Sequence, residues 1–197
     1  MILTTNSELR KIPQTRALEI IERYQVEKEL REQIDPGISP VELICQWLKE
    51  EMYNEVVTFL CHALPAREAV WWGCLCLQLV TDPSDNPLPQ DQQQALDAAE
   101  RWVREPTEAN RRSAEARSKR AELDNAAGWL AQSAFWSGGS ITPIDAPASP
   151  VPPYLYSHAV AGAVCLAAIL PDGSKARENY KRMIGIGLDI ADGGNGC

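Results

Sequence analysis

The sequence predicts an all-α protein, a single-domain bundle of about eight helices around two buried apolar helices, residues 66–80 and 156–170. Residues 69–80 carry no charge, and Gln78 is their only polar side chain, so no side of the first helix suits water. As a helix this run is about 18 Å long, against roughly 30 Å for the hydrocarbon core of a bilayer, which favours a core helix over a membrane span. The second helix contains AVAGAVCLAAIL, whose small side chains let neighbouring helices approach closely. No segment predicts a strand, and no repeat with a period of about 20 to 50 residues is present.

The N-terminal part of the chain is expected to hold an arm and a first helix. Residues 1–14 are expected to form a flexible arm that stops at Pro13. Thr15 can then cap a helix that runs to about residue 34. Its apolar positions recur at roughly helical spacing and are Leu18, Ile21, Val26, Leu30 and Ile34.

Two further helices lead into the first buried helix. After a turn at residues 35–37, Ser39 and Glu42 form a capping box with Pro40 at the first helical position, which is a strong start signal. A helix over residues 53–63 follows, and its end leads into the helix 66–80. The apolar stripes of these two helices are Val41, Ile44, Cys45 and Leu48, then Tyr53, Val56, Val57, Leu60 and Leu64.

The middle of the chain alternates loops with helices. Residues 81–90 form a proline-rich loop, and a helix over residues 91–104 follows. Thr107 caps a helix over residues 108–122, which is polar nearly all round and forms a basic patch in an acidic chain. A helix then runs from Asp124, its expected N-cap, to Trp136. Its expected apolar stripe is Leu123, Ala126, Ala127, Leu130, Ala134 and Phe135.

A proline-rich surface segment, residues 137–155, precedes the second buried helix. We expect it to run extended across the surface, partly as polyproline II. Ser174 is the expected cap of the last helix, and the tail, residues 192–197, is expected to fray. The helical domain is therefore expected to span residues 15–191.

Charge and composition argue against several classes of protein. The net charge of −8 argues against a nucleic-acid binder, which needs clustered Lys and Arg. The first residues, MILTTNSELRKI, lack an apolar region behind their basic side chains, so neither a secretory signal nor membrane insertion is expected. Most of the six cysteines lie in apolar helical surroundings, so we expect free thiols and a cytoplasmic location. No cofactor is expected, and the oligomeric state stays open.

The candidate metal and phosphate sites have simpler explanations. Cys74 and Cys76 lie two positions apart on a helix, so their thiols diverge by about 200°, and with Cys61 and His62 they form no CxxC or HxxxH pair. Buried thiols, and no metal, are therefore expected. The stretch Ser137 to Ser140 (SGGS) could hold a phosphate, but it follows a helix rather than a strand, which favours a glycine C-cap. The motifs GxSxG, HExxH, Walker A and the dinucleotide fingerprint are absent.

Histidine and tryptophan supply two further hypotheses. His62 lies at a helix C-terminus, where an imidazolium would favour the helix dipole, and this interpretation is simpler than general-base catalysis. His158 has no carboxylate or nucleophile close in sequence. If Trp47, Trp129 or Trp136 is exposed beside the proline-rich segment, that surface is a candidate protein-binding site, because Trp and Arg dominate binding hot spots.

Five stretches of the sequence carry a family resemblance, and they are HALPAREAVWW from His62, AAERWVREPT from Ala98, FWSGGS from Phe135, VAGAV from Val160 and GLDIA from Gly187. They resemble those of an uncharacterised bacterial family of small helical proteins associated with type VI secretion gene clusters. The resemblance covers roughly residues 40 to 191. It implies a cytoplasmic accessory of a secretion apparatus, such as an adaptor or a chaperone for an effector, and it implies no catalytic residues.

The expected function is therefore non-enzymatic protein binding, as an adaptor or chaperone of a type VI-like secretion system. An immunity protein that blocks a toxin with its acidic surface is one alternative. A small-ligand protein or enzyme is another, and it requires His62, Arg67 and the Gly138-Gly139 loop to converge on one pocket. Helix capping alone also remains open for each candidate binding residue. The candidate partner-binding residues are Arg67, Glu68, Phe135, Trp136, Ser137, Gly138 and Gly139.

Overall fold

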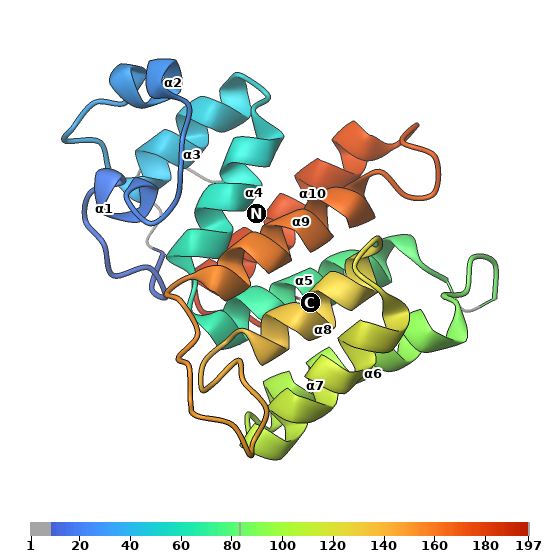
Figure 1. Ribbon diagram of the computed structural model, residues 1–197. Helices are drawn as coiled ribbons and strands as arrows, with labels where there is room; N and C mark the ends of the chain where they lie inside the picture. The colour runs from blue at the N-terminus through green and yellow to red at the C-terminus, as the bar shows by residue number, and fades with distance from the viewer. Residues whose placement is uncertain (1–8, 83, 197) are drawn as a thin grey trace.

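A computed structural model describes residues 9–82 and 84–196 and confirms the all-α fold class (Figure 1). Within these residues the chain forms ten helices and no strand, and no helix is long and apolar enough to cross a membrane. The helices are α1 (Leu18–Ile21), α2 (Lys28–Gln33), α3 (Pro40–Lys49), α4 (Tyr53–Ala63), α5 (Ala66–Val80), α6 (Gln90–Arg104), α7 (Glu108–Ala121), α8 (Ala126–Phe135), α9 (Leu155–Ala168) and α10 (Ala176–Ala191).

The two apolar helices lie at the centre of the bundle, as the sequence predicts. α5 packs against α6, α8, α9 and α10, and α9 packs against α4, α5, α8 and α10. Trp72 of α5 is fully buried, and its indole Nε1 donates a hydrogen bond to the carbonyl oxygen of Met183 on α10, at 2.7 Å. This bond gives a buried polar atom its partner and ties the C-terminal helix to the core.

The prediction of one helix over residues 15–34 is wrong, because the chain forms two short helices, α1 and α2, with a break between them. Two residues of the break make tertiary contacts with α4. Arg23 donates a hydrogen bond to the carbonyl oxygen of His62 at 2.6 Å, and the Tyr24 ring lies 4.4 Å from the His62 ring. These contacts with α4 outweigh local helix propensity, which is a weak preference.

Both ends of the described chain are packed rather than loose. The predicted arm is held from Leu9 onward, since Leu9 and Ile12 are buried and Lys11 donates its backbone N–H to Ala191 at 2.8 Å. Residues 1–8 of the arm lie outside the described residues. The tail folds back too, because Gly194 donates to the carbonyl oxygen of Asp189 at 2.8 Å and Trp71 donates to that of Asn195 at 2.9 Å.

The helix starts show which capping predictions are correct. The Ser39–Glu42 capping box is present, and Thr107 accepts a hydrogen bond from the backbone of Asn110. The cap of α8, however, is Asn125 rather than Asp124, and its side chain accepts from the backbone of Gly128 at 2.9 Å. Asp124 therefore lies on the preceding loop and Leu123 is 42% exposed, outside the apolar stripe. Ser174 is not a cap either, because α10 begins after Lys175 without a side-chain cap.

α7 is not polar all round, because one stripe of it is buried against the bundle. The buried side chains of α7 follow helical spacing and are Arg111, Ala114, Ser118 and Ala121. Ser118 donates to Gln132 of α8 at 2.6 Å, so the polar members of the stripe have partners. α7 is thus an amphipathic helix whose buried stripe consists of small and polar residues, which apolar periodicity does not reveal.

Candidate functional site

Arg111 of α7 holds the loop that follows α8. Its side chain is 4% exposed, and its two terminal nitrogens donate to the carbonyl oxygens of Phe135 and Ser140 at 2.7 and 3.0 Å. The Nε atom and one terminal nitrogen also bind the carboxylate of Glu108, and these hydrogen bonds lower the pKa of Glu108 to about 2. A buried guanidinium is stable here because carbonyl oxygens and a carboxylate accept its hydrogen bonds.

One glycine of this loop, Gly139, lies directly against Arg111. Gly139 has a φ of +70°, and a Cβ atom at this position would lie 3.0 Å from a terminal nitrogen of Arg111. Gly139 is therefore required both by its left-handed backbone and by the close approach of Arg111. The second half of the SGGS stretch, Gly139 and Ser140, thus contacts a cation that belongs to the protein itself.

The prediction that the proline-rich segment runs extended is wrong, because the segment folds back on itself. Ile141 donates to the carbonyl oxygen of Ser149 at 2.9 Å, and Val151 donates to that of Gly139 at 3.1 Å. The Ser140 hydroxyl lies 2.7 Å from that of Thr142 and accepts the N–H of Ser149 at 3.0 Å. We call residues 139–151 the hairpin.

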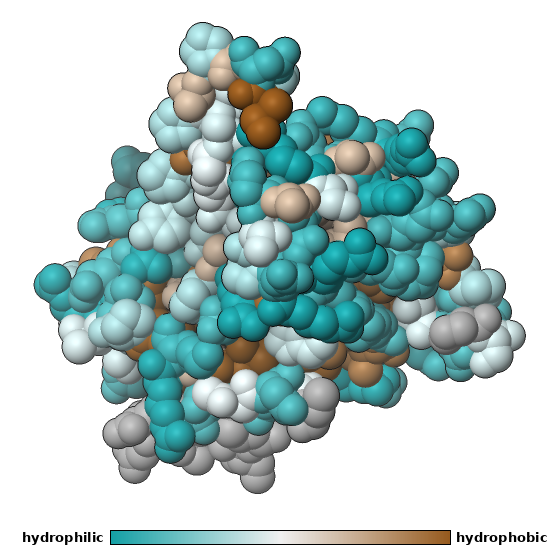
Figure 2. Space-filling model, turned by 90° about the horizontal axis from the view of Figure 1, so that it is seen from below, coloured by the Kyte–Doolittle hydropathy of each residue, from teal (hydrophilic) through white to brown (hydrophobic). Residues whose placement is uncertain are grey.

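The hairpin presents an apolar side chain to solvent. Ile144 is 89% exposed, the highest value among the exposed large hydrophobic residues. Figure 2 views the molecule from the side on which the hairpin lies in Figure 1, and this face is mainly hydrophilic with small hydrophobic patches. Ile141 is 39% exposed as well, so the hairpin offers two apolar side chains that a partner can bury.

The other half of the predicted binding surface lies elsewhere. Arg67, exposed at the start of α5, donates to the carbonyl oxygen of Val103 at 2.6 Å, and Glu68 pairs with Lys11 at 2.7 Å. Both side chains line a cavity of about 310 Å³ with Trp71. The lining of this cavity includes none of residues 135–139. The structure therefore does not bring the two halves together.

His62 lies in a third place. It is fully buried, its Nδ1 lies 2.8 Å from the carbonyl oxygen of Thr58, and its ring lies 4.6 Å from that of His158. Burial lowers the pKa of His62 to about 4, so the ring is neutral at pH 7 and does not act as the cation at a helix C-terminus that we expected. His62, Arg67 and the Gly138-Gly139 loop have separate partners, so they lack the convergence that the ligand or enzyme alternative requires.

The cysteines of the apolar helices behave as buried thiols. Cys61, Cys74 and Cys76 are free and buried, and burial raises the pKa of each. Across residues 9–82 and 84–196, no group of three or more His, Cys, Asp or Glu side chains could hold a metal ion.

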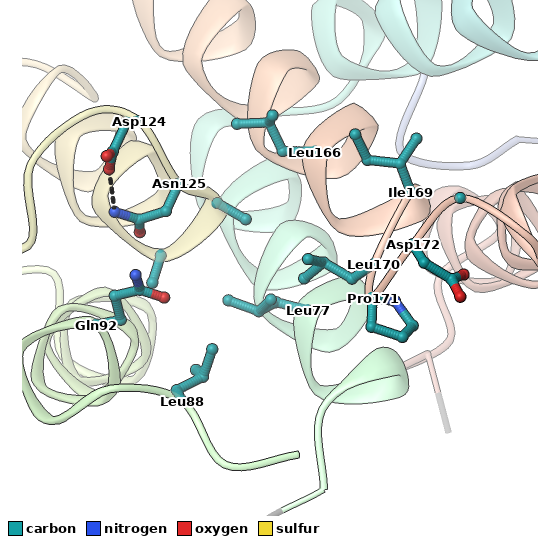
Figure 3. Close-up of a pocket in the computed structure, with 13 residues that line it drawn as sticks. Leu77, Leu88, Gln92, Asp124, Asn125, Leu166, Ile169, Leu170, Pro171 and Asp172 are labelled. Atoms are coloured by element: carbon teal, nitrogen blue, oxygen red, sulfur yellow. Dashed lines mark hydrogen bonds between the residues drawn. The ribbon is translucent and has the colours of Figure 1, made fainter.

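A surface that the sequence analysis did not identify lies where α5 and α9 end and α6 and α8 begin (Figure 3). It is a cavity of about 570 Å³, and its floor is apolar. Two carboxylates and two carboxamides lie at its rim. The floor is formed by Leu77, Leu88, Ala126, Ala127, Leu166, Ile169 and Leu170, and the rim by Gln92, Asp124, Asn125 and Asp172.

A second cavity of about 480 Å³ lies farther along α9 and shares Leu166 and Ile169 with the first. Trp129 of α8 lies on one side of it, and Asn54 of α4 and Tyr180 of α10 on the other. We call the two cavities together the groove. The stripe of α9 that faces the groove follows helical spacing and consists of His158, Gly162, Cys165, Leu166 and Ile169.

The groove and the hairpin lie at opposite ends of α8. The groove includes Asn125 and Ala126 at the start of this helix, and the hairpin begins just after its end. α8 has ten residues and is about 15 Å long, and Trp129 of the groove lies within it. Trp136, which follows α8, is partly exposed between the groove and the hairpin, and its ring centroid lies 6.2 Å from that of Trp129, whereas Trp47 is buried.

Comparison with known proteins identifies a family and no close relative of known function. No curated protein sequence matches the chain, and no solved structure does. A family of unknown function, DUF6931, matches residues 43–191. The matched region runs from within α3 to the end of α10 and includes both the groove and the hairpin. The chain therefore belongs to the DUF6931 family.

Proposed function

We propose that this protein is a non-enzymatic, cytoplasmic protein-binding accessory, an adaptor or chaperone of a type VI-like bacterial secretion system. The observation that carries the proposal is the presence of two separate apolar surfaces, the groove and the hairpin, at opposite ends of α8. An adaptor has to contact two proteins at once, and two separate surfaces allow this.

The physical argument is the cost of leaving apolar side chains in water. Ile144 is 89% and Ile169 is 48% exposed, and burying such a side chain fully is worth about 1.5–3 kcal/mol. Contiguous exposed apolar surface bounded by polar residues is typical of binding sites. The secretion-system context of the proposal is supported by the resemblance of the HALPAREAVWW and FWSGGS stretches.

The test is an affinity pull-down of the tagged protein from its own cytoplasm, read by mass spectrometry. Ile169→Glu places a charge in the groove, and Ile144→Glu places one on the hairpin. We expect each variant to lose a different protein that the unaltered chain recovers. Gln33→Glu is the control, because it adds the same charge on the exposed surface of α2.

The identities of the recovered proteins decide between functions. A secreted effector together with a delivery component would support the adaptor. Recovery of a single toxin domain would favour the immunity alternative, for which the net charge of −8 is the supporting observation. If both variants recover the same proteins in the same amounts as the unaltered chain, the two-surface proposal is wrong.

A further inference from the structure

We infer that the groove binds a cationic amphipathic helix of the partner, with apolar side chains on the floor and Lys or Arg at the rim. This inference rests on the proposed function and names the chemistry of one partner. Its three supports are the shape of the groove, the sign of its rim charges and the orientation of the helices around it.

The shape fits a helix. The exposed stripe of α9 runs from His158 to Ile169, which is about 16 Å or three helical turns. Trp129 lies on one side of it, and Asn54 and Tyr180 lie on the other, so the groove follows the axis of α9. A helix laid in such a groove places apolar side chains at every third or fourth position on the floor.

The rim is acidic. Figure 3 shows Asp124 and Asp172 on opposite sides of the larger cavity, with the leucines of the floor between them. Asp124 accepts a hydrogen bond from the side chain of Asn125 at 2.9 Å, and Asp172 accepts one from the backbone N–H of Ser174 at 3.0 Å. The bonds from Ser174 lower the pKa of Asp172, so this rim carboxylate is ionised at neutral pH.

The cations that would neutralise these carboxylates are not part of the groove. In the part of the chain that the structure describes, no Lys or Arg lines either cavity, and neither Asp124 nor Asp172 forms an ion pair. Lys175 interacts with Asp172 at longer range and lines a separate cavity beyond Pro171. At the other end of the groove, burial is the main cause that raises the pKa of Tyr180, and the negative charge of Glu55 adds to it.

The helix dipoles around the groove do not change the negative charge of its rim. α5 and α9 end at the larger cavity, and α6 and α8 begin there, so two negative and two positive helix ends meet. Their partial charges oppose one another, and the N-terminus of α8 is already capped by Asn125. The carboxylates therefore set the charge of the rim, which complements Lys and Arg.

The experiment measures binding of two synthetic peptides to the full chain by fluorescence anisotropy. Both peptides are labelled amphipathic helices of three to four turns with the same leucine face. One carries lysines beside this face, and the other carries glutamates. We expect the lysine peptide to bind about tenfold more tightly, because each exposed pair with a rim carboxylate contributes a modest amount.

Variants separate the groove from the general negative charge of the protein. The double variant Asp124→Asn with Asp172→Asn is expected to remove most of the preference for the lysine peptide. Ile169→Glu is expected to weaken the binding of the glutamate peptide further. Glu29→Gln with Glu32→Gln removes two exposed charges on α2, outside both the groove and the hairpin, and is expected to leave the preference unchanged. Far-UV circular dichroism confirms that each variant is folded.

Three results would overturn the inference. One is equal affinity for both peptides, and a second is a lysine preference that the rim and control variants reduce equally. Failure of both peptides to bind would also overturn it. If Ile169→Glu still loses a partner in the pull-down in any of these cases, the proposed function stands and only the chemistry of the groove ligand is wrong.

Discussion

Arg111 carries a permanent charge into the interior, and its hydrogen-bond partners make this burial possible. The sequence shows a basic helix and a glycine-rich loop as separate features, but the structure joins them through the guanidinium. A single sequence contains no signal for this pairing, since the two segments are more than twenty residues apart and neither has an apolar pattern. The loop was therefore predicted as a candidate site, and the residue that shapes it was missed.

Replacing Arg111 is expected to destabilise the fold and loosen the hairpin. Arg111→Leu leaves the carbonyl oxygens of Phe135 and Ser140 without their donors, which should lower the free energy of unfolding by about 2–4 kcal/mol. Urea denaturation measures the loss, and hydrogen exchange of residues 139–151 reports the loosening. Arg112→Leu is the control, because Arg112 pairs with Glu108 and Glu115 and lies over the Phe135 ring but donates to no carbonyl oxygen of the loop, so a smaller loss is expected for it. Equal losses for the two variants would contradict the role of Arg111.

His62 is expected to make the fold sensitive to acid. Burial is the main cause of its lowered pKa of about 4, against an ordinary value of 6.5 for histidine. As the pH falls below 6.5, His62 takes up a proton in the unfolded chain while it stays neutral in the folded one. The free energy of unfolding that is fully present above pH 6.5 is therefore lost as the pH falls toward 4. The loss between pH 7 and pH 4.5 should be about 2 kcal/mol from this group.

The measurement is the free energy of unfolding of the unaltered chain and of His62→Phe at both pH values. The variant keeps an aromatic ring against Tyr24 and His158 but cannot titrate, so its stability should fall less. His158→Gln leaves the burial of His62 in place and should retain the steeper fall. If the free energy of unfolding declines equally in the unaltered chain and in His62→Phe, His62 is not responsible for the loss of stability in acid.

At the scale of elements, the sequence predicts those helices whose start, length and burial depend on neighbouring residues in the chain. The capping box of α3, the length of α5 and the apolar run of α9 are all local signals, and the structure has these helices close to the expected bounds. The break between α1 and α2 depends on contacts of Arg23 and Tyr24 with α4, which no local pattern encodes. The packing of α7 likewise depends on the polar pair Ser118 and Gln132.

The contact between α5 and α10 depends on a glycine and can be tested by a matched pair of variants. A Cβ atom on Gly187 would lie 2.6 Å from the ring of Trp72, which is held by its bond to Met183. Gly187→Ala should therefore cost about 1–3 kcal/mol through overpacking. Gly185 lies on the same helix, and a Cβ atom at this position would have nothing within 4 Å. Gly185→Ala should therefore be neutral or stabilise the fold by up to about 1 kcal/mol. Thermal unfolding of both variants checks this, and similar melting temperatures would contradict the close approach of α5 and α10.

For the whole molecule, the sequence located individual surface features but not their arrangement. The resemblance and the glycine pattern drew attention to Phe135–Ser140 and to Arg67, which prove to lie at separate places. The groove was missed because an almost uniformly apolar helix predicts complete burial, whereas the structure leaves one stripe of α9 uncovered. Which face a helix exposes depends on how many neighbours the fold supplies, and this is a property of the assembled bundle.

The central claim is that one chain holds two proteins through the groove and the hairpin. Native mass spectrometry of the complex recovered with the tagged chain tests this claim most directly. The account predicts a species whose mass is that of the chain plus two different proteins, one lost in Ile169→Glu and the other in Ile144→Glu. A chain that carries one protein at a time, or whose two partners compete for the same surface, would contradict it.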